Sequence, residues 1–351
     1  MRPISKVFVI GAGASRDAAD LPLGQDLVWR YHSQTGLFKI VGEHGQIDLS
    51  GENASYANLT RFLEWAVEVY PELKPDLEAW RNRGLYHFER RFENKQYYVD
   101  EMLKVAFERD QLDTLELIRR LIFEHLVEAT RRGKSDLYYD FLELLLRDAD
   151  PGEVIIITFN FDYLLVEDFK REIYFDYGLD FDYQHGREAY CRRHPIRLLK
   201  LNGSLDWGLC SACGKLHLYY PNLFRGHYED NVCAVDCGGK LSPYILVPHQ
   251  SYDGPILSLW DEAACVIREA EHISVIGYSF PDYDDRARDL LSSNLRPNTK
   301  VTVVDYRPDD NPDLGTSAIQ KHYATLLPSL DSLVDVHLDG FAAYVEHLKN
   351  G

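Results

Sequence analysis

The stretch Lys6-Val7-Phe8-Val9-Ile10-Gly11-Ala12-Gly13-Ala14-Ser15 decides the fold class of this chain. Its residues 7–10 are apolar and mostly β-branched at consecutive positions, as expected for a strand buried on both faces of a sheet. The two glycines that follow allow a tight turn, after which a helix begins. Amides at the start of such a helix can bind a pyrophosphate, so the stretch predicts an α/β unit with an anion-binding turn.

Similar runs of buried-strand character recur along the chain, and helical stretches separate several of them. They cover residues 153–158, 197–201, 244–247, 272–276 and 300–304. This alternation predicts a Rossmann-like α/β fold, with a mostly parallel sheet and helices on both faces. We expect this domain to comprise residues 1–45 and 150–351, and to close with a helix from Phe341 to Lys349.

The pattern between Ala57 and Arg147 is helical, and we expect residues 46–149 to form a large helical insertion. One face of its longest helix carries Leu115, Ile118, Ile122, Leu126 and Ala129. Asp113 and Glu116 resemble a capping box at its start, and residues 131–133 resemble its end. The segment is rich in aromatic residues, for which core packing is the default and a partner interface is the alternative. They include Tyr97, Tyr98, Tyr138, Tyr139 and Phe141.

Four cysteines form a C-x2-C pair and a C-x3-C pair, with 19 residues between the pairs: Cys210, Cys213, Cys233 and Cys237. Thiolates at this spacing can turn toward one centre and complete the closed tetrahedral shell of a structural zinc ion. We therefore expect a small zinc-ribbon-like module at residues 205–243. Disulfides are the alternative, but no secretory signal is visible that would place the chain in an oxidising compartment. Cys191 and Cys265 stay outside the two pairs.

Composition narrows the functional classes. The chain has 351 residues, of which 45% are hydrophobic, and a formal net charge of -18. A negative charge of this size argues against a surface that binds the phosphates of nucleic acids. Its apolar runs are far shorter than the roughly 20 residues of a membrane span. No targeting segment is visible, so we expect a cytoplasmic protein that binds neither nucleic acids nor membranes.

Polar residues follow several of the expected strands. Asn160 and Asp162 follow the run at 153–158, Gly277 and Ser279 follow the run at 272–276, and Asp305 follows the run at 300–304. In open α/β sheets, ligands bind at the carboxyl ends of the strands. Singly, each of these residues could be a helix cap or a turn residue. Together they predict one joint site.

The order of the segments resembles the sirtuin family. These are Gly11 to Ser15, Thr158 to Asp162, Lys200-Leu201-Asn202-Gly203-Ser204, the four cysteines and Gly277-Tyr278-Ser279, supported by the stretch from Cys237 to Ile245. The resemblance covers roughly residues 5–35 and 150–310 and leaves the helical segment without a counterpart. It implies a dinucleotide-binding sheet with a zinc module, and cleavage of NAD at its nicotinamide glycosidic bond.

The resemblance also implies roles for individual residues. Gly11, Ala12, Gly13 and Ser15 would hold the phosphates of NAD, with help from Gly277 and Ser279. Asn160 would orient the ribose or an attacking water, and Asp162 would lie near the nicotinamide amide. Asp305 would contact the adenosine half.

Two positions depart from the pattern of sirtuin deacylases. Asn202 stands where those enzymes have a histidine, and an amide cannot take up a proton near neutral pH. Residues 23–26 replace an Asp-Phe-Arg stretch. Among the other histidines, His185, His194 and His249 are interpreted as surface or satisfied residues, whereas His217 and His227 lie in the zinc module, where four thiolates need no fifth ligand.

These departures favour hydrolysis of NAD over deacylation, because loss of nicotinamide depends on orientation and electrostatic support more than on a strong base. The chain resembles the NAD-depleting effectors of prokaryotic anti-phage systems, which implies a homo-oligomer or a partner protein from a defence system. Asn202, as a third candidate catalytic residue beside Asn160 and Asp162, would hold a ribose or a water. The alternatives are a module that binds NAD or ADP-ribose without cleaving it, and a protein deacylase or ADP-ribosyltransferase.

Overall fold

The computed structural model of the chain divides into two compact units, residues Met1–Leu21 with Gly133–Gly351, and residues Pro22–Arg132. It describes residues 6–21, 23, 54–75, 78, 99–132, 136–147, 153–167, 175–179, 181–183, 196–218, 232–233, 237–246, 255–305, 316–326 and 334–350. The two units are treated separately below. The domain boundaries expected from the sequence stay a prediction.

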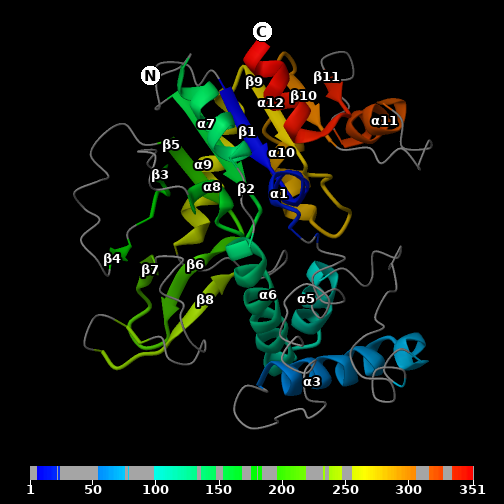
Figure 1. The fold of residues 1–351 in the computed structure, drawn as a ribbon, viewed down its shortest axis with the longest axis vertical. Coiled ribbons are helices and arrows are strands. Elements are labelled where there is room, and N and C mark those ends of the chain that lie inside the picture. Colours follow the sequence, from blue (N-terminus) through cyan, green and yellow to red (C-terminus); the bar gives the residue numbers. More distant parts are fainter. Residues whose placement is uncertain are drawn as a thin grey trace. The chain divides into compact units, whose positions relative to one another are not determined.

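The first unit is built on a seven-stranded sheet in which every neighbouring pair is parallel (Figure 1). The strand order is β11-β10-β9-β1-β2-β5-β3. Their bounds are β1 Lys6–Ile10, β2 Val154–Thr158, β3 Phe175–Asp176, β5 Ile196–Lys200, β9 His272–Ile276, β10 Lys300–Val304 and β11 Val334–His337. Strands added after β1 extend the sheet first on one side and then, from β9 on, on the other. The strand order therefore reverses between β1 and β9, where open α/β sheets bind ligands.

The central strands are apolar on both faces, as the sequence predicts. All five residues of β2 are buried, and so are residues 7–10 of β1. The expected strands at 272–276 and 300–304 are confirmed as β9 and β10, whereas β11 lacked a strong enough apolar run to be foreseen. The α/β fold class with a mostly parallel sheet is confirmed.

Helices cover both faces of this sheet (Figure 1). On one face lie α1 (Ala12–Ala19), α7 (Leu137–Arg147) and α12 (Gly340–Asn350). Phe141 of α7 joins them to the sheet, since its ring lies 5.2 Å from Phe8 of β1 and 5.2 Å from Phe341 of α12. On the other face are α9 (Ile256–Glu269) and α10 (Asp285–Ser292), and α8 (Leu164–Glu167) and α11 (Thr316–Leu326) complete the described helices of this unit. The expected closing helix is confirmed as α12.

A second, smaller sheet carries the cysteines. Its order is β4-β7-β6-β8, with β4 Asp182–Tyr183, β6 Gly203–Cys210, β7 Leu216–Leu218 and β8 Leu241–Ile245. Trp207 fills its core, with its ring 5.4 Å from Tyr177 and 5.1 Å from Phe181. The prediction that residues 244–247 form a strand of the parallel sheet was wrong. Tyr244 and Ile245 belong to β8, which pairs antiparallel with β6. The prediction failed because burial on both faces does not reveal strand direction.

The second unit is helical, with α3 (Ala54–Val69), a 3-10 turn η2 (Pro71–Leu73), α5 (Val99–Glu108) and α6 (Leu112–Arg132). The predicted apolar face of α6 is confirmed, because Leu115, Ile118, Ile122 and Leu126 are buried. The capping box is wrong, since α6 begins at Leu112 and places Asp113 inside its first turn. Tyr97 and Tyr98 lie outside the described residues. Among the helices that the structure describes, each is too short or too polar to cross a membrane.

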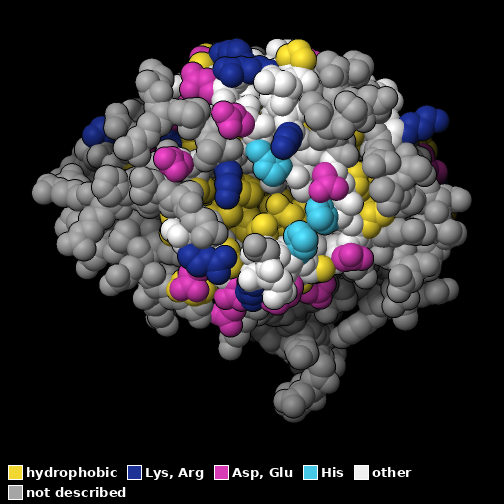
Figure 2. Space-filling view, turned by 90° about the horizontal axis from the view of Figure 1, so that it is seen from above, with side chains coloured by type: hydrophobic (Ala, Val, Ile, Leu, Met, Phe, Trp, Pro, Cys, Tyr) yellow, Lys and Arg dark blue, Asp and Glu magenta, His cyan; other side chains and the backbone are white. Residues whose placement is uncertain are grey.

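The amino ends of the strands form a face of their own. In Figure 2, charged side chains of both signs and His side chains surround hydrophobic side chains at the centre of the view. His272, at the start of β9, bonds to Thr302 Oγ1 at 2.8 Å. The ring of His337, the last residue of β11, lies 5.5 Å from that of His347. Among the described residues, only the four cysteines lie close enough together to hold a metal ion in a set of three or more.

Candidate functional site

The carboxyl ends of the parallel strands form one continuous edge. The backbone hydrogen bonds of the sheet extend one residue beyond β5, β2, β1, β9 and β10. The donor and acceptor pairs are Leu201 N to Thr158 O at 3.0 Å, Phe159 N to Ile10 O at 3.3 Å, Gly11 N to Ile276 O at 2.9 Å, Gly277 N to Val304 O at 2.8 Å and Asp305 N to His337 O at 2.9 Å. The segments that the sequence singled out after these strands therefore lie side by side.

Three glycines meet backbone to backbone at the reversal point between β1 and β9. Gly13 N donates to Gly277 O at 2.9 Å. A Cβ atom on Gly11 would lie 2.5 Å from Gly277 O, and one on Gly277 would lie 2.2 Å from Ala14 N. Gly277 also has a φ of +62°, in the left-handed region that favours glycine. We call Gly11, Gly13 and Gly277 the glycine seam.

The glycine seam uses most of the amides at the start of α1. Gly13 N is bonded to Gly277, and Ala14 N donates to Gly11 O at 3.1 Å. Among the described residues, the amide of the exposed Ala12 has no hydrogen-bond partner. The helix N-terminus therefore presents one amide to an anion, together with the positive end of the helix dipole.

A buried polar network lies beside the glycine seam. Asn160 Nδ2 donates to Gly11 O at 2.9 Å and to Ser15 Oγ at 3.0 Å, and Ser15 Oγ lies 2.8 Å from the hydroxyl of Tyr138. Ser15 also lowers the pKa of the Asp162 carboxyl. Both amide hydrogens of Asn160 are thus engaged, so this side chain can offer a ligand only its carbonyl oxygen. We call Ser15, Tyr138, Asn160 and Asp162 the strand-end network.

Ionisable side chains are buried under this network. Lys200 Nζ donates to the carbonyl oxygen of Asp162 at 2.6 Å. Burial raises the pKa of Asp162, while the charge of Lys200 and the side chain of Ser15 oppose that rise. Burial lowers the pKa of Lys200, while Asp206 and Asp162 oppose that change. Shifted and mutually dependent carboxyl and ammonium groups at a sheet edge are typical of functional sites.

Asn202 and its neighbours line the adjoining strand end. Asn202 Nδ2 donates to the carbonyl oxygen of Phe159 at 3.4 Å, and the side chain is 5% exposed. Gly203, at φ +77°, could not carry a Cβ atom, which would lie 1.9 Å from Tyr244 O. Trp260 of α9 donates from Nε1 to Leu201 O at 3.0 Å, and its ring lies 6.0 Å from that of Phe159. These contacts fix the backbone around Asn202.

The segment after β9 is more exposed. The ring of Tyr278 stacks on Phe159 at 4.5 Å, whereas Ser279 is exposed and its carbonyl oxygen lies 2.9 Å from His322 Nε2. Asp305, one strand further on, is partly exposed, and its carbonyl oxygen accepts from Gly340 N at 3.1 Å. Ser279 thus follows β9, the neighbour of β1, and Asp305 follows β10, one strand further out, while the strand-end network lies on the other side, between β1 and β5.

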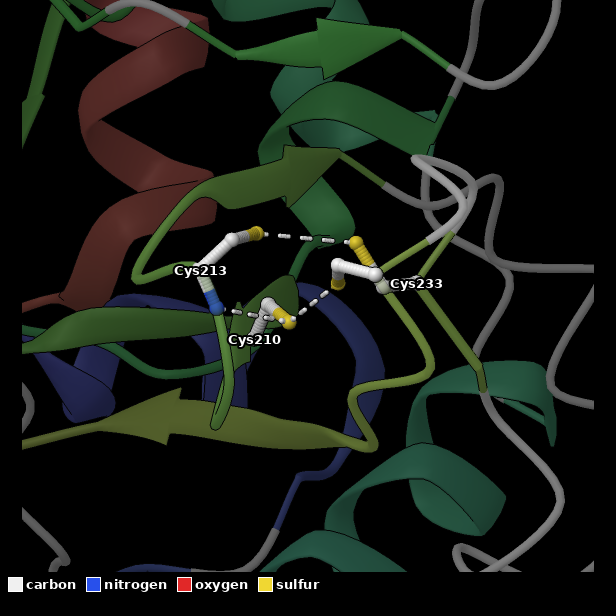
Figure 3. Close-up of side chains that lie close together, drawn as sticks. Cys210, Cys213 and Cys233 are labelled. Carbon is white, nitrogen blue, oxygen red and sulfur yellow. Dashed lines mark hydrogen bonds between the residues drawn. The ribbon is translucent and has the colours of Figure 1, made fainter.

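The four cysteines form one compact cluster (Figure 3). Their sulfur atoms all lie within 4.8 Å of one another, with Cys210 3.5 Å from Cys237 and Cys213 3.7 Å from Cys233. Tetrahedral zinc with Zn–S bonds of about 2.3 Å places thiolates roughly 3.8 Å apart, whereas a disulfide requires about 2.05 Å. Backbone N–H groups of Cys213 and Ala212 lower the pKa of Cys210 to about 6, which favours the thiolate that a metal binds. The cluster is consistent with a structural zinc site.

One contact of this cluster is not apparent from the cysteine spacing. His217 of β7 is fully buried, and its Nε2 lies 3.2 Å from the sulfur of Cys233. From the sequence we expected that four thiolates need no nitrogen ligand. In the structure the imidazole lies at hydrogen-bond distance from the Cys233 sulfur. Outer-sphere contacts of this kind orient metal ligands.

Tyr138 is the site residue that sequence reasoning assigned to packing. An aromatic residue on the apolar face of a helix gives no signal that separates a core ring from a hydrogen-bonded phenol. Other expectations fall on residues outside the described part of the chain. These are His185, His194, His227, His249, Cys191 and residues 24–26.

Comparisons with known proteins give fold-level likenesses only. No protein-family model and no curated protein matches the chain. Among solved structures it is similar to Sir2Tm bound to a propionylated peptide, with 13% identity, a TM-score of 0.44, and 99% of this chain and 93% of that chain covered. It is similar to a Sir2 homologue in complex with NAD, with 14% identity, a TM-score of 0.45, and 99% and 91% covered.

A third similar structure is a mutant Sir2 homologue in complex with ADP-ribose, with 15% identity, a TM-score of 0.45, and 99% of this chain and 93% of that chain covered. At these values the likenesses do not decide what this chain binds. The proposals below therefore depend on the chain's own residues.

Proposed function

We propose that this protein is a sirtuin-like NAD glycohydrolase, which binds NAD at the carboxyl edge of its parallel sheet and releases nicotinamide and ADP-ribose. The observation that carries the proposal is that the glycine seam, at the reversal point of the sheet, contacts the strand-end network beside it through the bond from Asn160 to Gly11 O. Dinucleotides bind at such points in open α/β sheets. The sirtuin-like order of the segments in the sequence supports the same ligand.

The binding half of the proposal follows from the chemistry of the edge. The pyrophosphate would lie against Ala12 and Gly13 at the start of α1, with Gly277 and Ser279 beside it, because glycine lets the backbone approach closely. The hydroxyl of Ser15, in the first turn of α1, would help to hold the phosphates. Asp305 would accept hydrogen bonds from the adenosine ribose. These roles are proposals on the geometry described above.

The reaction half assigns roles to the strand-end residues. In hydrolysis, the bond between N1 of nicotinamide and C1′ of the ribose breaks, and its electron pair goes to nicotinamide. Water adds to C1′, and one proton is released. The carbonyl oxygen of Asn160 would accept from the attacking water or a ribose hydroxyl. The charge of Asp162 would stabilise the positive ribose, or its carboxylate would accept from the nicotinamide amide.

Asn202 limits the chemistry available. Its amide cannot remove a proton, and in the structure it donates to Phe159 O. This observation favours a second candidate function, a module that binds NAD or ADP-ribose without cleaving it. Calorimetry that finds NAD binding while chromatography finds no nicotinamide would select this second function.

The test incubates the purified, zinc-loaded chain with NAD and resolves nicotinamide and ADP-ribose by chromatography. We expect both products in equal amounts, and Asn160→Ala to lower the rate about 100-fold, as for loss of a group that orients a reactant. Asn294→Ala, at the end of α10 and away from the site, is the matched control and should keep the wild-type rate. Zinc content should be the same in all three proteins.

If no oligomeric form of the wild-type chain releases nicotinamide or ADP-ribose, the protein is not an NAD hydrolase. A loss of zinc in Asn160→Ala equal to its loss of rate would show that the substitution acts through unfolding. A homo-oligomer, a partner protein in anti-phage defence and a cytoplasmic location belong to the same proposal through the sequence resemblance. Light scattering of the purified chain, alone and with NAD, tests the first of these.

A further inference from the structure

Helix α11 contacts the loop that follows β9 through two adjacent side chains. The hydroxyl of Tyr323 donates to Tyr278 O at 3.0 Å, and His322 Nε2 lies 2.9 Å from Ser279 O. A carbonyl oxygen can only accept, so this nitrogen of His322 carries the proton of the bond. Tyr323 is 2% exposed, whereas His322 lies at the surface. Two successive residues of the helix thus hold two successive peptide groups of the loop.

The two peptide groups held in this way lie on either side of Ser279. Both are trans, so the C=O and the N–H of each group point in opposite directions. The C=O of Tyr278 points to α11, and the N–H of Ser279 therefore points away from that helix. Within the described part of the chain, neither this N–H nor the hydroxyl of Ser279 has a hydrogen-bond partner. The exposed Ser279 thus presents two unused donors on a fixed backbone.

The loop needs this support because its backbone is strained. Gly277 has a φ of +62° and Phe280 a φ of +46°, so both residues lie in the left-handed region. This region is disfavoured for a bulky residue, and such strain persists only when the surroundings over-determine it. The ring of Phe280 is buried, 4.6 Å from that of Tyr278 and 6.2 Å from that of Tyr323. Tyr323 therefore supports the loop twice, through its ring and through its hydroxyl.

Other contacts of this loop hold a side chain instead of the peptide groups. The hydroxyl of Tyr278 donates to Asp284 Oδ2 at 2.5 Å, and its ring stacks on Phe159 at 4.5 Å. These contacts fix the ring of Tyr278. Among the described elements, α11 is the one that bonds the peptide groups on both sides of Ser279. The direction of the two Ser279 donors therefore depends on this helix.

We infer that His322 and Tyr323 are positioning residues of this site, which fix the peptide groups around Ser279 and so hold its N–H and its hydroxyl ready for the phosphates of the ligand. Donors that are already oriented lose less conformational entropy when a ligand binds. The inference rests on the proposed function for the identity of that ligand, NAD. The hold of α11 on the loop is a property of the free protein.

The sequence allows each of the two peptide groups to be observed by itself in the full chain. It contains one Tyr-Ser pair, Tyr278-Ser279, and one Ser-Phe pair, Ser279-Phe280. Protein with ¹³C at the carbonyl carbon of tyrosine and ¹⁵N in serine therefore gives a single NMR signal that correlates the two nuclei. Labelling serine with ¹³C and phenylalanine with ¹⁵N gives the signal of the second peptide group. The carbonyl shift reports whether the oxygen accepts a hydrogen bond.

The first measurements are made without a ligand. We expect Tyr323→Phe to move the carbonyl signal of Tyr278 upfield, as loss of a hydrogen bond does. His322→Leu should do the same to the carbonyl signal of Ser279. His322→Gln should restore that signal, because a glutamine N–H can reach the same oxygen. Rescue by glutamine separates the hydrogen bond of His322 from mere packing of its ring.

Tyr344→Phe is the matched control. It removes the hydroxyl of a buried tyrosine of α12, which lies 3.5 Å from Ser274 Oγ and not at the loop. Both carbonyl signals should keep their wild-type positions in this variant. An unchanged signal in either Tyr323→Phe or His322→Leu would overturn the inference. So would an equal displacement in Tyr344→Phe, since it would show that the loop responds to any lost phenol of the unit.

NAD then tests the functional consequence separately. In the wild type, NAD should move the ¹⁵N signal of Ser279. We expect Tyr323→Phe to weaken NAD binding about three- to tenfold, the effect of losing one neutral hydrogen bond, and Tyr344→Phe to leave it unchanged. A protein that fails to bind NAD but shows the expected carbonyl shifts would overturn the proposed function and leave the hold of α11 on the loop intact. NAD turnover with an unmoved Ser279 signal and equal affinity in Tyr323→Phe would do the reverse.

Discussion

The cysteine cluster and the strand-end network are both small sets of polar groups, but the chain assembles them in different ways. The cysteines come from two short segments, Cys210–Cys213 and Cys233–Cys237, so local spacing nearly suffices to bring the sulfur atoms together. In the strand-end network, Ser15 is 123 residues from Tyr138 and 145 residues from Asn160. We expect the first set to depend on a bound metal, whereas the second depends on the packing of the whole parallel sheet.

The largest expected effect is the loss of a metal-binding cysteine. Cys210→Ser should lose its zinc and lower the free energy of unfolding by roughly 5 kcal/mol or more, because metal binding contributes directly to folding. Zinc analysis and chemical unfolding measure the two quantities. Cys265→Ser, a lone exposed cysteine of α9, is the control and should keep both at wild-type values. A stable Cys210→Ser protein that retains zinc would mean that the cluster is not a metal site.

A pair of glycines sharpens the comparison, because both have positive φ but differ in their surroundings. Gly277, in the glycine seam, has φ +62° and no room for a Cβ, whereas Gly214, in the cysteine cluster, has φ +68° and nothing within 4 Å of that position. We expect Gly214→Ala to cost about 1 kcal/mol from backbone strain, and Gly277→Ala to cost roughly 3 kcal/mol or more from strain plus collision with α1. Urea unfolding compares them, and equal costs would contradict the close approach at the seam.

His217 tests whether the cysteine cluster also depends on a more distant residue. We expect His217→Phe to weaken zinc binding about 10- to 100-fold, the usual effect of losing a contact to a metal ligand. Competition with a chromophoric chelator measures the affinity. The spectrum of the cobalt-substituted protein should keep its four-thiolate character. If the wild type instead shows the spectrum of three thiolates and one nitrogen, and the variant does not, His217 is a direct ligand.

The smallest expected effect concerns pH. Burial raises the pKa of Asp162, so the folded chain holds this proton more tightly than the unfolded chain does. Its contribution to stability is therefore present below the unfolded pKa of about 3.9 and is lost as pH rises through the folded value. Asp162→Asn cannot titrate, so its stability relative to the wild type should increase over that range, by about 1 kcal/mol.

Urea unfolding at a series of pH values checks this sign. The control is Asp261→Asn, an exposed carboxylate of α9, which should follow the wild type across the series. A relative stability of Asp162→Asn that falls as pH rises would mean that Lys200 and Ser15 outweigh burial at this site.

The sequence predicted those features whose signal is local. The run at residues 7–10 is apolar at consecutive positions, and its burial on both faces follows from that. The cysteine pairs carry their own geometry in their spacing. Strand direction is not encoded in neighbouring residues, which explains why the run at 244–247 was assigned to the wrong sheet.

Features that depend on distant packing were partly or wholly missed. The glycines after β1 suggested close approach of a ligand, and the structure adds that Gly13 approaches Gly277. Tyr138 gave no polar signal, because its partner lies 123 residues away. Asn160 and Asp305 were selected because they follow expected strands, and that rule concerns only the sheet. The contacts of these side chains also depend on the packed helices, such as the bond from Asn160 to Ser15 of α1, and the strand-end rule does not predict them.

Trp260 gives this molecule a built-in optical reporter. Its indole is buried, bonds to the carbonyl oxygen just before Asn202, lies near Phe159 and carries the guanidinium of Arg286 4.2 Å above its ring. A nearby cation and a fixed hydrogen bond both tune indole fluorescence, so we expect a ligand that binds at this edge to change the emission of Trp260. Binding at the proposed site should then be measurable in real time, without an added label.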